Sequence, residues 1–147
     1  MLEIKTKTFQ ELTTQELYNI LQLRSEVFVV EQDCVYQDLD GKDEKALHVI
    51  GFKADKIVAY TRIFRPGLYF EASSIGRVVV AQNQRKHKYG FTIMEASIDA
   101  IKQHYNETII KISAQCYLKK FYNSLGFKEI GAEYLEDGIP HIAMLKN

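Results

Sequence analysis

The sequence predicts a single α/β domain in which helices cover a mixed β-sheet. In the middle of the chain, short β-branched strand patterns alternate with helical patterns, which is typical of parallel pairing. Strand–turn–strand patterns on either side indicate antiparallel hairpins. The 147 residues are the length of one ordinary domain, and neither a Gly/Ser-rich linker nor an internal repeat divides them. We therefore predict one domain over residues 1–147.

The N-terminal part of the chain predicts a strand and then a helix. Residues 2–7 alternate apolar and polar side chains, which is the period of a half-buried strand. Thr13 is followed three residues later by Glu16, so the two can form the reciprocal capping box that opens a helix. The helical period continues to the β-branched and aromatic run at residues 27–30, where we expect the helix to break or bend.

The rest of the chain predicts six strands around two helices. One helix spans Tyr89–Tyr105, and a shorter one spans Tyr117–Leu125. Gly126 follows the shorter helix, and we expect it in the left-handed conformation that commonly ends a helix. The predicted strands are, in chain order, residues 48–54, 57–64, 74–80, 108–114, 128–135 and 141–145, the last two forming a hairpin around Asp137–Pro140.

Composition excludes several classes of function. Lys and Arg together number 19, as do Asp and Glu, so the net charge is zero and we expect no nucleic-acid partner. No apolar run approaches the ~18 residues of a membrane helix, and the N-terminus lacks a signal-peptide pattern. Cys34 and Cys116 have neither the CxxC pairing nor the His spacing of a metal site. We therefore expect a reduced, cytoplasmic protein with no metal and no membrane partner.

An acidic stretch spans residues 31–44 and predicts a loop. It contains six carboxylates against Lys42 alone: Glu31, Asp33, Asp38, Asp40, Asp43 and Glu44. A calcium loop with Gly41 at its sixth position would lack both of its key carboxylates, so calcium is disfavoured. Two readings stay open: a solvated acidic turn with Gly41 at positive φ, or the edge of a site that attracts a cationic amine.

Two arginines occur where apolar residues are expected. Arg24 interrupts the apolar face of the first helix, and Arg77 lies in a Val-rich strand. Burying either one unpaired would be costly. They can form a structural ion pair with Glu31, or they can line a substrate pocket at the open end of the sheet.

A basic loop joins the buried strand at residues 74–80 to the helix that starts near Gly90. Within it Arg85, Lys86, His87 and Lys88 follow one another. The free N–H groups and the positive end of a helix N-terminus attract phosphate, and a glycine allows close approach. This loop predicts either a phosphate cradle or a solvated basic turn. It matches neither the Walker nor the Rossmann glycine motif.

Two motifs resemble those of the GNAT superfamily of N-acetyltransferases. Arg85-x-x-x-x-Gly90 after a Val-rich strand resembles its acyl-CoA-binding motif, and residues 115–127 resemble its second signature. Lys88 stands where that first motif has a glycine, and Gln115 stands for the usual Asn. The ElaA-like branch of the superfamily is similar over nearly the whole chain, through residues 27–32, 36–41, 74–78, 114–115 and 136–141.

The resemblance implies a GNAT fold, with a mixed, mostly antiparallel sheet flanked by about four helices. The sheet would be splayed between the strand ending near Val80 and the strand ending near Ala114. The pantetheine arm of acetyl-CoA would lie in that gap. The cosubstrate-binding residues would be Val78, Val79, Val80, Arg85, Lys86, His87, Lys88, Tyr89, Gly90 and Gln115.

The reaction implied is direct transfer of an acetyl group from acetyl-CoA to an amine of a small molecule or peptide, without a metal. The resemblance makes Tyr122 the general acid for the departing thiolate. The general base stays open between Glu31, His48, His141 and a water relay. Expected substrate-side residues are Arg24, Glu31, Arg77 and His141. The rival function is a non-catalytic acyl-CoA-binding sensor or interaction module. The protein is expected to be a monomer or a homodimer.

Overall fold

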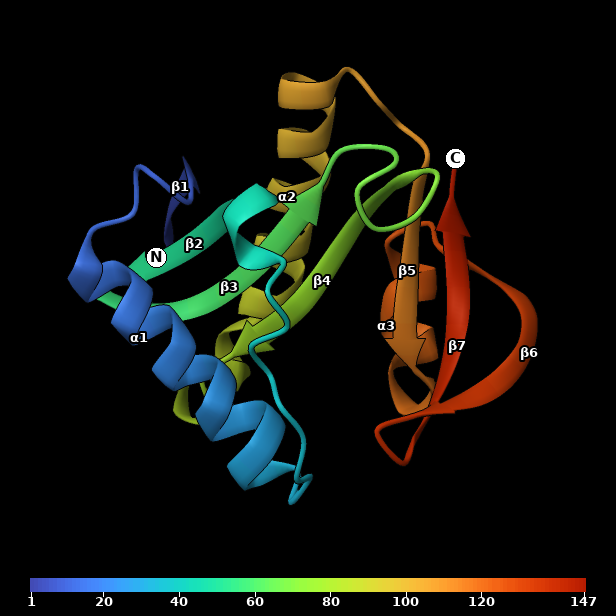
Figure 1. Cartoon of the computed structure of the whole chain (residues 1–147), viewed down its shortest axis with the longest axis horizontal. Coiled ribbons are helices and arrows are strands. Elements are labelled where there is room, and N and C mark those ends of the chain that lie inside the picture. Colours follow the sequence, from blue (N-terminus) through green and yellow to red (C-terminus); the bar gives the residue numbers. More distant parts are fainter.

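The computed structural model describes all 147 residues and shows one mixed sheet of seven strands in the order β1-β2-β3-β4-β5-β7-β6 (Figure 1). Every neighbouring pair is antiparallel except β4 and β5. The predicted mixed, mostly antiparallel sheet is therefore confirmed. The strands are β1 (Glu3–Thr8), β2 (Leu47–Lys53), β3 (Lys56–Phe64), β4 (Ser73–Val80), β5 (Ile110–Gln115), β6 (Lys128–Glu136) and β7 (Ile139–Lys146).

Three α-helices and four short helical turns complete the fold. Helix α1 opens with the predicted capping box between Thr13 and Glu16, and it continues as a π-helical segment at the expected break. Gly126 has the expected positive φ of 97°. The helical segments are α1 (Thr14–Arg24), η1 (Ser25–Glu31), η2 (Asp43–Lys45), η3 (Gln82–His87), α2 (Tyr89–Tyr105), η4 (Cys116–Leu118) and α3 (Lys119–Ser124).

The closing hairpin is tighter than the sequence pattern indicated. We expected a loop around Asp137–Pro140, but β6 and β7 run to either side of a two-residue turn. Asp137 and Gly138 have φ of 52° and 77°, the positive pair that favours such turns because its twist matches that of the strands. The turn therefore places residues 136 and 139 directly opposite each other.

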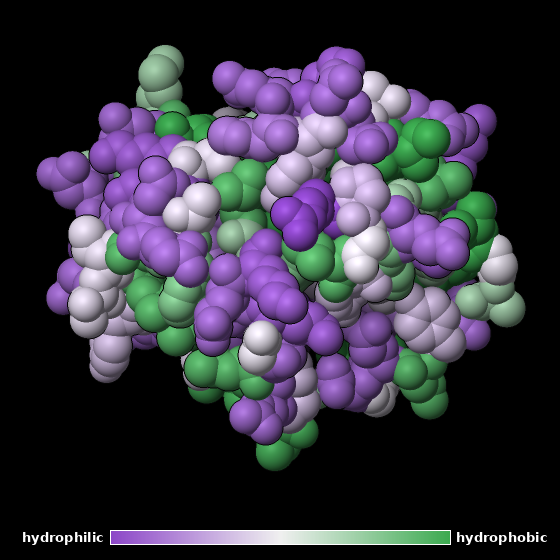
Figure 2. Space-filling view, turned by 45° about the horizontal axis from the view of Figure 1, so that its top comes forward, coloured by the Kyte–Doolittle hydropathy of each residue, from purple (hydrophilic) through white to green (hydrophobic).

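The two faces of the sheet build two hydrophobic cores. Ile50 and Tyr60 pack with α1, while their neighbours Val49 and Ala59 pack in the larger core with α2, as the alternation of strand side chains requires. Figure 1 shows α1 in front of the sheet and α2 behind it. The face seen in Figure 2 is mixed, with hydrophobic residues in small separate groups among hydrophilic ones. The two hydrophobic cores thus cover both faces of the sheet.

Strands β4 and β5 are the point at which the sheet opens. They pair in parallel only at Ser73 with Ile110 and Ser74 with Lys111. Beyond that, β4 is bulged: Arg77 has φ of 50°, and its register with β3 shifts between Tyr60 and Arg62. The two strands diverge from there (Figure 1), so the rest of the β4 edge that faces β5 has no strand partner. The splay that the resemblance implied is confirmed.

The long loop between η1 and β2 is held by Arg24, whose side chain is fully buried. Its Nε donates to Asp38 Oδ2 at 2.8 Å, and its Nη1 donates to Asp43 Oδ1 at 2.7 Å. Of the two alternatives for Arg24, the structural ion pair is the one found, but its partners are Asp38 and Asp43 and not Glu31. Asp38 and Asp43 are 14 and 19 residues from Arg24 in the sequence, so only the folded loop brings them to it and no local pattern predicts these pairs.

Two more arginines share the same loop carboxylates. Arg62 Nη1 lies 3.0 Å from Asp43 Oδ1, and Arg62 also pairs with Asp40. Arg77 Nε lies 2.7 Å from Asp38 Oδ1. Three guanidinium groups thus balance three carboxylates, and these three acids keep no free charge with which to attract an amine. We call the set formed by Arg24, Asp38, Asp40, Asp43, Arg62 and Arg77 the arginine–aspartate network.

The network makes stability depend on acid pH. Burial raises the pKa of Asp43, but the hydrogen bond from Arg24 and the charges of Arg24 and Arg62 outweigh it, so the pKa is lowered on folding. The folded state then binds fewer protons than the unfolded state. The stabilisation is complete above the unfolded pKa of ~3.9 and is lost as pH falls toward the folded value. Urea unfolding at a series of pH values between about 6 and 2 measures this loss.

Asp43→Asn tests the origin of that dependence. It removes the carboxylate that Arg24 and Arg62 share, so we expect a loss of ~3 kcal/mol or more at pH 7, as for other broken buried ion pairs. The variant should also show a shallower dependence on acid pH than the wild type. Glu44→Gln is the control, because Glu44 is exposed beside it. Equal stability of Asp43→Asn and the control at pH 7 would contradict this account.

Candidate active site

The divergence of β4 and β5 opens a cleft of about 580 Å³, within the size range of small-molecule sites. Its walls come from β4, β5, α3, the start of α2, the end of η1 and the turn between β6 and β7. Apolar side chains line the interior, including Val79, Ile112 and Phe121. Charged groups such as Arg85 and Glu136 lie among them and supply specific polar contacts.

One end of the cleft is the N-terminus of α2. Lys88 precedes the helix with φ of 59°, a conformation that costs a non-glycine residue ~1 kcal/mol and explains why the motif has a glycine here. No side chain caps this helix, so its first N–H groups are free to bind an anion. A Cβ on Gly90 would lie 3.4 Å from the ring of Phe121. This is an ordinary van der Waals distance, so α3 already lies in contact range of the start of α2.

Arg85 pairs with Glu31 at the end of η1 on one side of the cleft. Its Nη2 donates to Glu31 Oε1 at 2.7 Å and its Nη1 to Oε2 at 2.5 Å, while its Nε donates to the Val80 carbonyl oxygen at 3.2 Å. The hydrogen bond from Arg85 lowers the pKa of the Glu31 carboxyl against a smaller effect of burial. A carboxylate held in this way is a weak base, so Glu31 is disfavoured as the general base.

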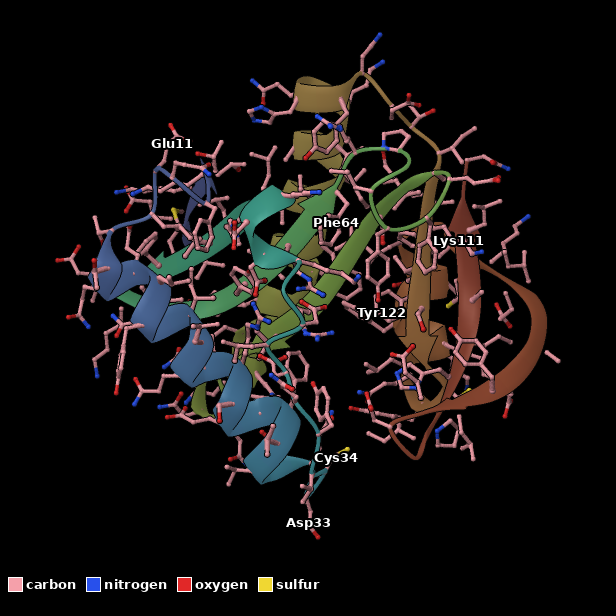
Figure 3. The ribbon with its side chains drawn as sticks, viewed as in Figure 1. Glu11, Asp33, Cys34, Phe64, Lys111 and Tyr122 are labelled. Carbon is pink, nitrogen blue, oxygen red and sulfur yellow. The ribbon has the colours of Figure 1, made fainter.

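The residues that follow Glu31 continue over the cleft. Gln32 Nε2 donates to Gln115 Oε1 of β5 at 3.3 Å, and Cys34 Sγ donates to the Asp137 carbonyl oxygen at 3.2 Å. Figure 3 shows Cys34 below the gap between β4 and β5, where η1 ends. These contacts tie the two halves of the sheet together at the open end of the splay.

Tyr122 of α3 enters the cleft from the far side of the sheet. The residue is 6% exposed, and its ring packs edge-on against Phe121 and against Phe127, which folds back as expected after Gly126. Burial, with a smaller contribution from Tyr117, raises the pKa of the Tyr122 phenol. The hydroxyl is therefore protonated at neutral pH, and Tyr122, labelled in Figure 3, is one of the residues that line the cleft.

The opposite wall carries a cluster in which only His141 was a candidate site residue from the sequence. Ser113 of β5 donates to Glu136 Oε1 at 3.3 Å and also bonds to the hydroxyl of Tyr134. Glu136 Oε2 lies 3.5 Å from His141 Nε2. Only the register of β5, β7 and β6 brings these side chains together, and the available signal was the hairpin around Asp137–Gly138.

The structure brings most of the expected site residues to this one cleft. Those that line it are Glu31, Arg77, Val78, Val79, Val80, Arg85, Lys88, Gly90, Gln115, Tyr122 and His141. They come from elements spread over more than a hundred positions of the chain, so the fold concentrates them.

Five other candidates lie elsewhere. Lys86 and His87 are exposed on η3 and do not line the cleft. Tyr89 is buried, with the Lys53 ammonium 5.8 Å from its ring centre. Arg24 is enclosed in the arginine–aspartate network. His48 is buried against the Tyr60 hydroxyl, at 2.6 Å, and burial lowers its pKa, so it is a structural side chain rather than a base in the cleft.

A metal site and a membrane-spanning helix each require a particular arrangement of residues. The structure holds no group of three or more His, Cys, Asp or Glu side chains that is arranged to bind a metal. No helix is both long enough and apolar enough to cross a bilayer.

Comparison with known proteins places the chain in a family. The model described as Acetyltransferase (GNAT) domain matches residues 8–147. Protein ElaA of Escherichia coli is 40% identical over 148 residues, covering 99% of this chain and 97% of that protein. A UPF0039 protein of Schizosaccharomyces pombe is 41% identical over 145 residues, covering 97% and 95% of the two chains.

Solved structures agree with the sequence comparison. The chain is similar to an acyl-CoA N-acyltransferase from Pseudomonas aeruginosa with a TM-score of 0.94 and 38% identity, and to Escherichia coli ElaA with a TM-score of 0.92 and 40% identity. Both comparisons cover 100% of each chain. The protein therefore belongs to the GNAT family of acetyltransferases and has ElaA among its relatives.

Proposed function

We propose that the protein transfers the acetyl group of acetyl-CoA to an amine by direct attack of the amine on the thioester. The observation that carries this proposal is the splayed edge of β4, which leads from the free N-terminus of α2 to the hydroxyl of Tyr122. A peptide-like pantetheine arm needs such an edge, because its amides can hydrogen-bond to the unpaired backbone at Val78–Val80.

The residues present fit the rest of acetyl-CoA as well. The free N–H groups at Tyr89 and Gly90 are suited to the pyrophosphate, and Lys88 adds positive charge beside them. Arg85 adds its charge when phosphate replaces Glu31 as its partner. The apolar wall of the cleft suits the carbon chain of the arm. Backbone amides carry most of this recognition, so the departures at Lys88 and Gln115 are compatible with it.

The chemistry requires three contributions from the chain. A backbone N–H of Val79 or Val80 polarises the thioester carbonyl, because it is fixed in the cleft and aims at the charge that develops on oxygen. The walls hold the amine and the thioester together. Tyr122 donates its proton to the departing thiolate, since burial keeps the phenol protonated.

Release of free CoA thiol tests the proposal directly. The protein is mixed with acetyl-CoA and with a panel of small primary amines and lysine-containing or N-terminal peptides. Turnover with any of these amines supports an N-acetyltransferase. Binding of acetyl-CoA without turnover on the whole panel favours the non-catalytic acyl-CoA sensor, and absence of CoA binding overturns both functions.

Tyr122→Phe removes only the hydroxyl and keeps the aromatic packing with Phe121 and Phe127. We expect kcat to fall ~100-fold or more, the usual size of a general-acid contribution, while the affinity for acetyl-CoA changes little. Steady-state kinetics and calorimetry measure the two effects. Tyr18→Phe is the matched control, because Tyr18 is exposed on α1. A Tyr122→Phe variant that turns over like the control shows that the residue only packs.

Glu31 and phosphate compete for the guanidinium of Arg85. Glu31→Gln frees Arg85 from its bidentate partner, so we expect tighter binding of CoA, by a few-fold. Arg85→Ala should weaken binding ~10-fold, because a hydrogen bond to a charged group contributes ~1.5 kcal/mol. Calorimetry with CoA measures both variants, and Glu26→Gln, at an exposed acid of the same helical segment, is the control. Unchanged affinity in both variants would make the Glu31–Arg85 bridge a purely structural clamp.

A further inference from the structure

The cluster on the β5–β6–β7 wall has the arrangement of a proton acceptor for a cationic amine. We propose that His141 removes the proton of the acceptor ammonium and that Glu136 binds this ammonium and holds the imidazole in place. This inference rests on the proposed acetyl transfer and adds to it the charge class of the acceptor and the residue that neutralises it.

The hydrogen bonds of His141 define where its proton lies. Nδ1 is 2.7 Å from the carbonyl oxygen of Ile139, and a carbonyl oxygen only accepts, so Nδ1 carries the hydrogen. In the neutral ring Nε2 is then an acceptor with a free lone pair. The residue is 6% exposed and lines the cleft, and its Nε2 lies on the side of Glu136, another residue of the cleft wall.

The Glu136 carboxylate is a second hydrogen-bond acceptor beside His141 Nε2. Its Oε2 lies 3.5 Å from His141 Nε2, and two acceptors at this distance leave a place for a donor that touches both. A primary ammonium, with three N–H groups, can donate one to each atom. The donation from Ser113 to Oε1, itself bonded to the Tyr134 hydroxyl, fixes the carboxylate in this position.

The charges around the cleft favour a cation at this place. Arg77 is paired with Asp38, and Arg85 is paired with Glu31, so the nearby guanidinium groups are neutralised. Glu136 has only His141 as an ionic neighbour, and that contact is charged only when the ring is protonated. The Glu136 side chain is 44% exposed, so its carboxylate is accessible to an incoming ammonium.

The proposed reaction begins with a proton transfer from the ammonium to His141. The ammonium gives one proton to His141 Nε2 and becomes a neutral amine, whose lone pair forms the N–C bond with the thioester carbonyl. Collapse of the adduct breaks the C–S bond, and the thiolate takes the proton of Tyr122. The remaining excess proton on nitrogen restores the tyrosine. His141 then releases its proton to water, so the products are the amide, CoA thiol and one proton.

Other titratable groups surround the imidazole and enter any pH dependence. Tyr134 of β6 stacks on the ring at 6.1 Å, and Asp137 is in the turn that follows Glu136. Across the cleft, Tyr36, Cys34 and Arg77 line the same space. The effect of His141 is therefore identified by comparing variants rather than from one wild-type profile.

His141→Asn is the first test. An asparagine amide can still donate to the Ile139 carbonyl oxygen, but it has no lone pair at the Nε2 position. With the amine that the wild type turns over, we expect kcat to fall ~100-fold or more, the acidic limb of the kcat/KM profile to disappear, and acetyl-CoA affinity to stay within about two-fold. His104→Asn, at an exposed histidine of α2, is the matched control.

Two further readouts separate a base from a packing residue. Added imidazole should restore part of the turnover of His141→Ala, which a lost structural contact would not allow. Glu136→Gln should raise the acceptor KM ~10-fold with a smaller change in the KM for acetyl-CoA, whereas Glu133→Gln, at an exposed acid of the same strand, should change neither. Neutral alcohols of the same shape should not compete with the amine.

The outcomes distinguish this inference from the proposed function. A wild type without turnover on any amine contradicts acetyl transfer itself. A wild type that turns over, together with a His141→Asn variant of near wild-type kcat and unchanged acidic limb, contradicts only the role of His141. An acceptor KM that Glu136→Gln leaves unchanged contradicts the ammonium site.

Discussion

The pairing between β4 and β5 stops after two residues, and the rest of the site depends on this. A parallel pair would normally continue, since each further residue satisfies backbone groups. Here the bulge at Arg77 turns β4 away, with the backbone of Arg77 in a conformation that non-glycine residues seldom adopt. Asp38 holds the Arg77 guanidinium, and Arg24 holds Asp38. The arginine–aspartate network therefore fixes the bend that opens the sheet.

The open sheet concentrates groups that a closed sheet would keep apart. It leaves a polar backbone edge of β4 without a strand partner, and this edge shares one cleft with the start of α2 and with Tyr122 of α3. Gln32 and Cys34 cross the open end, where they bond to Gln115 and Asp137, and limit how far the halves can separate. Under the proposed function, the cosubstrate and the cationic acceptor would bind to different walls of this one cleft.

Local features were predictable from the sequence, and long-range pairs were not. The capping box at Thr13, the positive φ of Gly41 and Gly126, and the helix Tyr89–Tyr105 follow from a few neighbouring residues, and the structure confirms them. The splay followed from the resemblance of the motifs to a family. The partners of Arg24 depend on how the loop between η1 and β2 folds back onto α1, which no local pattern encodes.

Glu136 shows the same limit within the candidate site. In the sequence, Glu136 is an ordinary acid before a turn. The two-residue turn sets the register that brings it next to His141, and only this contact indicates a role in the site. His141 was a candidate base from its residue type alone, and the hydrogen bond to Ile139 assigns its tautomer. Sequence identified the residue types, and the register decided which of them meet.

Hydrogen exchange with and without CoA tests the central claim most directly, that the splayed β4 edge is the docking surface. If the account is correct, CoA should slow exchange of amides within residues 75–80 and in the first turn of α2, with little change in β1 and β2. Slowed exchange elsewhere, with residues 75–80 and the start of α2 unchanged, would contradict it.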